Sequence, residues 1–83
     1  MMSKLQGYSH GVVTAVAALD PASVWGSFMQ ACVKQGVPIA QIARDLRVSR
    51  PTVYSWLTGQ FQPNGVHVDM MRAWLSANLR NTA

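Results

Sequence analysis

The chain has 83 residues, of which 49% are hydrophobic and 12% are charged, and its formal net charge at pH 7 is +4. This length allows one domain with one small core. The charged share is about half of the usual ~25%, and a small chain with so few charges often covers apolar surface in an oligomer. We therefore expect a homodimer. No segment reaches the roughly 20 apolar residues of a membrane span, so we expect no membrane partner.

Residues that carry chemistry are few. Cys32 is the only cysteine, which excludes an intramolecular disulfide, and its apolar surroundings in the sequence predict a small core residue. His10 and His67 are isolated and lack metal-ligand spacing. There is no Gly-rich phosphate loop, no paired-carboxylate arrangement and no Cys/His cluster. The sequence thus predicts no catalytic residue, no metal, no cofactor and no small-molecule ligand, and the protein is not expected to be an enzyme.

The first 19 residues differ in pattern from the rest. Residues 1–19 form a predicted N-terminal arm, followed by one domain over residues 20–83. Within the arm, Val12 to Leu19 is apolar, and its β-branched content leaves a short helix and a strand equally open.

The domain is predicted to begin with a bracing helix. Asp20 and Pro21 are typical of an N-cap and a first helical residue, and Gly36 is typical of a helix end near Gln35. One apolar stripe along this helix, with Trp25 and Met29 beside it, comprises Val24, Phe28, Ala31 and Cys32.

Two short helices are predicted next, over Ile39 to Leu46 and from Ser49 to just before Gly59, with a break at Arg47 and Val48. Ser49 is a good N-cap, Pro51 falls in the first turn, where a missing N–H costs nothing, and Gly59 can end the helix in a left-handed conformation. Ala43 is small where the two helices would come closest. The expected buried positions are Ile42, Leu46, Val48, Val53, Trp56 and Leu57.

A last helix is predicted from a cap at Asn64 to about Leu79, with a wide apolar face. Part of this face closes the core. The remainder, especially Met70 and Trp74, is either a dimer surface or further core, and the pattern leaves both open. The chain as a whole is predicted to be all-α, a small bundle of four to five helices.

The segment Val37 to Gly59, VPIAQIARDLRVSRPTVYSWLTG, resembles the helix-turn-helix of phage repressor and Cro-like proteins, the lambda-repressor-like superfamily. The resemblance covers roughly Ser23 to Leu79 and includes the Gly and Pro of Gly59 to Pro63. Ser49 to Tyr54 is also similar to the recognition helix of resolvase and invertase DNA-binding domains, and the sequence does not separate the two relatives.

This segment departs from the family pattern at two positions. The elbow holds Arg47 where the family usually has Gly, and a left-handed residue other than Gly costs roughly 1 kcal/mol, so we expect a slightly different turn. Pro38 occupies the start of the first of the two helices. The family often has a Gln near this start that contacts a phosphate, whereas Gln41 comes later in this chain.

The resemblance implies that the second helix lies in the major groove of double-stranded DNA. Base contacts are then expected from Ser49, Arg50, Pro51, Tyr54, Ser55 and Thr58. Phosphate contacts are expected from Gln41, Arg44, Arg47, Thr52, Gln60 and Gln62. Among these, Arg50 is the expected base reader, because a guanidinium can bond guanine O6 and N7 together. Three of the seven cations lie within Arg44 to Arg50, which suits phosphate contact.

The resemblance thus implies a Cro-type transcriptional repressor or regulator, binding as a dimer to a palindromic operator in the cytoplasm of a bacterium or phage-infected host. Two alternatives are a protein-interaction module, such as a phage-type inhibitor of a host factor, and a recombination-directionality or architectural DNA-binding factor.

Overall fold

A computed structural model describes the backbone of residues 9–80 and the side chains of residues 9–78. These residues form five α-helices and no strand, which confirms the predicted all-α bundle. In chain order the helices are α1 (His10–Ala17), α2 (Val24–Gln35), α3 (Ile39–Leu46), α4 (Arg50–Leu57) and α5 (Gly65–Arg80). Within this part of the chain, none of them is long and apolar enough to cross a membrane.

The apolar stretch whose conformation the sequence left open is helix α1. Its N-cap is Ser9, whose hydroxyl accepts a hydrogen bond from the backbone N–H of Val12 at 3.1 Å. Val12 and Val16 are buried, and α1 packs against both α2 and α4. The part of the predicted arm before Ser9 lies outside the described residues.

Helix α2 begins later than the sequence predicts. Asp20 and Pro21 lie in a turn instead of the first turn of the helix, and the N-cap is Ser23, whose hydroxyl accepts from the Gly26 N–H at 2.9 Å. The Asp20 carboxylate accepts from the Ala22 N–H at 2.9 Å, so this side chain caps its own turn. Asp20 and Ser23 are both good N-cap types. The Ser23 hydroxyl also donates to the Asp20 carbonyl at 2.8 Å, so the hydrogen bonds of this turn keep Asp20 outside the helix.

Helices α2 and α3 end in the same motif. In each, a left-handed residue follows the helix, and the next residue donates its N–H five residues back, from Val37 to Cys32 at 2.9 Å and from Val48 to Ala43 at 2.9 Å. The left-handed residues are Gly36 at φ 73° and Arg47 at φ 59°. Arg47 therefore takes at the elbow the left-handed conformation that Gly36 takes at the end of α2, although it carries a side chain.

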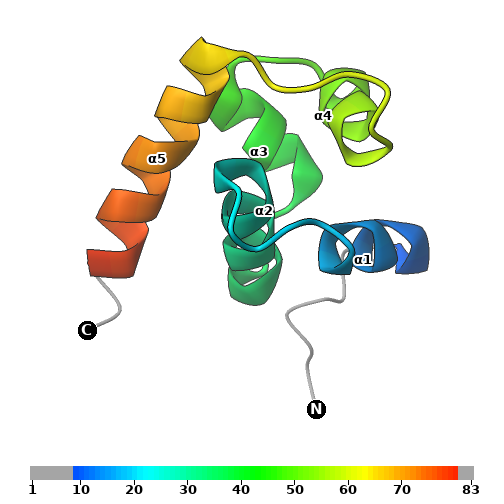
Figure 1. Ribbon diagram of the computed structural model, residues 1–83, viewed down its shortest axis with the longest axis horizontal. Coiled ribbons are helices and arrows are strands. Elements are labelled where there is room, and N and C mark those ends of the chain that lie inside the picture. The colour runs from blue at the N-terminus through cyan, green and yellow to red at the C-terminus, as the bar shows by residue number, and fades with distance from the viewer. Residues whose placement is uncertain (1–8, 81–83) are drawn as a thin grey trace.

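The core is built around α2. Figure 1 shows α5 along one side of the bundle and α1 and α4 on the other, with α2 between them. The most deeply buried side chains of the core come from four helices. They are Phe28, Met29, Cys32, Ile42, Leu46, Val53 and Met71. Aromatic rings join the helices, since Trp25 lies edge-on to Trp56 with centroids 5.6 Å apart and Phe28 lies edge-on to Trp74 at 5.3 Å.

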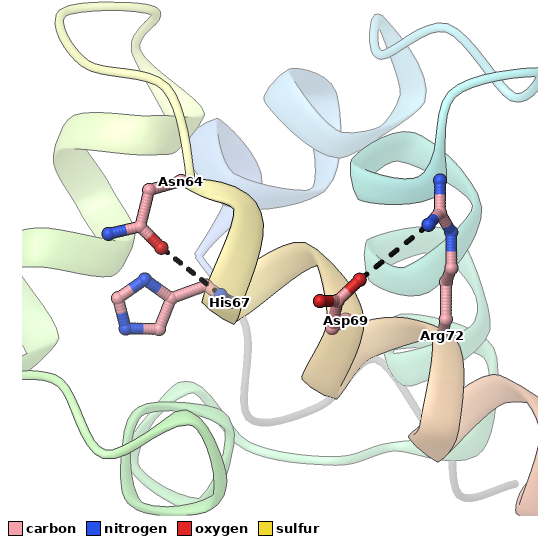
Figure 2. Close-up of polar contacts among 4 residues, drawn as sticks. All are labelled: Asn64, His67, Asp69 and Arg72. Atoms are coloured by element: carbon pink, nitrogen blue, oxygen red, sulfur yellow. Dashed lines mark hydrogen bonds and ion pairs between the residues drawn. The ribbon is translucent and has the colours of Figure 1, made fainter.

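Helix α5 begins at the predicted cap, since the Asn64 side-chain oxygen accepts from the His67 N–H at 3.1 Å (Figure 2). Asp69 and Arg72 form an exposed ion pair at 3.6 Å on the outer side of the helix. Met71 is fully buried. The residues weighed as a dimer surface, Met70 and Trp74, are each partly buried and pack against the core of their own chain.

The buried thiol of Cys32 makes the stability of the fold depend on pH. Burial, and then the negative charge of Asp45, raises the pKa of this thiol from 9.0 to about 12. The unfolded chain loses the proton near pH 9 while the folded chain keeps it. The stabilisation is therefore complete below pH 9 and is lost as the pH rises towards 12.

We expect the free energy of unfolding to fall more steeply above pH 9 in the parent than in Cys32→Ala, by up to about 1.4 kcal/mol per pH unit. Urea titrations at pH 8, 9, 10 and 11 measure this difference. Parallel pH curves for the two proteins would contradict it.

Candidate nucleic-acid interface

Helices α3 and α4 pack together, and one side of α4 is buried in the core. Val53, Trp56 and Leu57 are buried at 0%, 5% and 8% exposure, and α4 packs on α3, where Ile42 and Leu46 are buried as predicted. Of the other five residues of α4, Arg50, Pro51 and Tyr54 are exposed, and Thr52 and Ser55 are half-buried. The outer side of α4 is therefore free to contact a partner.

The six predicted base-contacting residues all lie outside the core, along α4 and its two ends. Five of them are exposed and Ser55 is half-buried; they are Ser49, Arg50, Pro51, Tyr54, Ser55 and Thr58. Four of these positions, Pro51, Tyr54, Ser55 and Thr58, line one shallow hollow on the outer surface with Gln60. The i, i+3, i+4, i+7 spacing of the four explains why they share a face.

The start of α4 carries a pair of hydroxyl groups. The Ser49 oxygen accepts from the Thr52 N–H at 3.3 Å, and the two side-chain oxygens are 2.9 Å apart. Whichever of the two donates, the pair uses one hydroxyl hydrogen internally and leaves the other available. A hydroxyl donor at a helix N-terminus, beside the Arg50 guanidinium, is suited to an anionic oxygen.

The predicted phosphate-contacting residues lie on α3, at the elbow after it, at the start of α4 and in the loop after α4. Arg44, Arg47 and Arg50 are exposed, and across residues 9–78 the one ion pair, between Asp69 and Arg72, involves none of them. The three predicted glutamines are also exposed, Gln41 on α3 and Gln60 and Gln62 in the loop after α4, while Thr52 is half-buried. Exposed arginines outside the described ion pair, next to the exposed side of a helix, are suited to binding a polyanion.

One neighbour of this surface was not foreseen from the sequence. Ser9 and Val12, at the start of α1, line a hollow with Arg50, Tyr54 and the first turn of α3. A second hollow runs between Gly11 and Ala15 on one side and Tyr54 and Thr58 on the other. The only local signal was Ser9 as a helix cap, because the docking of α1 on α4 is a long-range contact that periodicity does not encode.

The left-handed conformation of Arg47 carries a cost that can be measured. We expect Arg47→Gly to raise the free energy of unfolding by about 0.5–1 kcal/mol, because glycine adopts φ 59° without strain. The same variant should bind DNA more weakly and with a salt slope reduced by about one unit if Arg47 contacts a phosphate.

Arg44→Ala is the matched control for this prediction. It removes a neighbouring exposed cation from regular helix, so its affinity should fall similarly while its stability changes by less than about 0.5 kcal/mol. Urea unfolding and binding across a salt series measure both quantities. A destabilised Arg47→Gly would contradict the account of the elbow.

Comparison with curated proteins and with solved structures found no significant match to the chain. Residues 29–61, less than half of the chain, match the model of the homeodomain-like domain. The matched segment spans the latter part of α2, the whole of α3 and α4, and the turn after α4. These are the elements that form the surface described above. Residues 29–61 are therefore similar to a homeodomain-like helix-turn-helix, and this similarity supports DNA binding.

Proposed function

We propose that the chain binds double-stranded DNA in a sequence-specific manner by inserting α4 into the major groove. One observation supports this above the others. Helix α4 buries Val53, Trp56 and Leu57 and presents its opposite side, with Arg50 at the leading end, to solvent. A helix of this kind fits a groove about 12 Å wide, and a guanidinium at its start can bond guanine O6 and N7 together.

In this proposal the surrounding residues position α4 without reading bases. Arg44 and Arg47 at the elbow neutralise phosphates, and the free hydroxyl hydrogen of the Ser49–Thr52 pair bonds another. The glutamines contact the DNA backbone on either side of α4: Gln41 reaches it from α3, and Gln60 and Gln62 reach it from the loop after α4. Tyr54 and Pro51 offer apolar contact to a thymine methyl group.

We further propose that the protein is a Cro-type transcriptional regulator that occupies a palindromic operator as a homodimer, in the cytoplasm. A single small helix-turn-helix reads few base pairs, so two copies about one helical turn apart increase specificity. Met70 and Trp74 are the proposed contacts between the copies. Their partial exposure at the edge of the core leaves surface available for that role.

Selection from a random duplex library, with the purified chain and sequencing of the bound pool, tests the proposal. A palindromic consensus is the expected result, and it would also give the half-site spacing. Tandem non-palindromic sites would favour a recombination-directionality or architectural factor. An unenriched pool with weak, salt-sensitive binding would overturn sequence-specific recognition.

A protein-interaction module is the second candidate, and one observation favours it. Phe61 and Val66 are 59% and 67% exposed, and both lie in or near the connection between α4 and α5. Exposed large apolar side chains of this kind are common at protein interfaces. If the duplex selection fails, capture of host proteins by the parent but not by Phe61→Ser would identify this function.

A further inference from the structure

The hydroxyl groups on the outer side of α4 are already hydrogen-bonded within the helix. Ser55 Oγ donates to the Thr52 carbonyl at 2.7 Å, and Thr58 Oγ1 donates to the Ser55 carbonyl at 3.1 Å. A hydroxyl group has one hydrogen and two lone pairs. With the hydrogen used internally, each of these side chains presents only acceptor capacity to an outside partner.

Ser55 is placed to use this capacity. It lines the shallow hollow on the outer surface of α4 together with Pro51 and Tyr54, and this is the surface that faces the proposed DNA. The side chain is also half-buried, and its hydrogen bond to Thr52 is short. Reorienting the hydroxyl to donate elsewhere would break that bond and leave the Thr52 carbonyl with one partner fewer.

The base edges in the major groove divide into donors and acceptors. Adenine N6 and cytosine N4 carry amino groups that donate, whereas thymine O4 and guanine O6 and N7 accept. Donation by Ser55 to an acceptor edge would exchange one hydrogen bond for another with little net gain. Acceptance from an amino group adds a hydrogen bond and keeps the existing one, so adenine and cytosine are the favoured bases.

We propose that Ser55 is a specificity-determining residue that accepts a hydrogen bond from the exocyclic amino group of adenine or cytosine. This inference rests on the proposed binding of α4 in the major groove. Arg50, a pure donor five residues nearer the start of α4, reads guanine. The half-site therefore combines a guanine, contacted by Arg50, with an amino-bearing base a short distance along the groove, contacted by Ser55.

The test removes single amino groups from the DNA. Once selection has defined a half-site, each adenine is replaced in turn by purine and each cytosine by 2-pyrimidinone, both of which lack the exocyclic amino group. Dissociation constants are then measured for the parent and for Ser55→Ala on every duplex. Alanine favours the helix, and thermal unfolding of the variant verifies that the fold is intact.

At one position we expect loss of the amino group to weaken binding by the parent about fivefold, the value of one neutral hydrogen bond. Ser55→Ala should bind the native duplex about fivefold more weakly and be insensitive to the same replacement. Equal losses for both proteins at every position would overturn the role of Ser55 while leaving DNA recognition intact. Failure of the selection to give any motif would overturn the proposed function itself, and this inference with it.

Discussion

Replacement of Arg50 by alanine is expected to cost about 1–3 kcal/mol of specific binding, about 5- to 150-fold in affinity, and to relax the preference for guanine at one base pair. The guanidinium is exposed at the first position of α4, and no ion pair in the described part of the chain competes for it. A bidentate contact discriminates between bases, so its loss should lower selectivity and affinity together. Binding to the selected operator and to its single-base variants measures both.

Arg72→Ala is the matched control, since it removes the same charge from an exposed site. Arg72 lies on α5 and is paired with Asp69, away from α4. At a fixed salt concentration its affinity for the operator should change little, and its base preferences should be those of the parent. An Arg72→Ala loss as large as that of Arg50→Ala would show that Arg50 acts through net charge alone.

The ends of the helices were largely predictable from the sequence, because capping is a local interaction. Ser49 caps α4, Asn64 caps α5, α2 ends at Gly36, and Gly59 takes a left-handed conformation, as the sequence predicts. The start of α2 was not predicted correctly. Asp20 and Ser23 are both suitable caps three residues apart, and the hydrogen bonds within the Asp20 turn leave the capping position to Ser23.

The outward side of α4 was predictable for the same local reason, since burial of every third or fourth residue leaves the others exposed. The proximity of α1 to Tyr54 and Arg50 was not, because it depends on how two segments far apart in the chain pack. The direction of the hydroxyl hydrogens on α4 could not be predicted from the sequence either. It depends on side-chain rotation against carbonyl oxygens such as that of Thr52.

Gly26→Ala is expected to destabilise the protein, although alanine is the better helix former by about 1 kcal/mol. Gly26 is buried in α2, and a Cβ atom there would overlap the backbone carbonyl oxygen of Asp20 and lie 3.0 Å from the Ser23 hydroxyl oxygen. Backbone atoms cannot rotate away as a side chain can. The turn that carries Asp20 must move and the cap at Ser23 is weakened, so the loss should reach at least the ~1–3 kcal/mol of overpacked cores.

Gly65→Ala separates this steric effect from helix propensity. Gly65 is the first residue of α5, and nothing lies within 4 Å of the position that its Cβ would occupy. The same substitution there should be neutral or stabilising by up to about 1 kcal/mol. Urea unfolding should therefore show a loss of stability for Gly26→Ala and no loss for Gly65→Ala. If both variants were stabilised, helix propensity would dominate at both sites, and the close approach of α2 to the Asp20 turn would be ruled out.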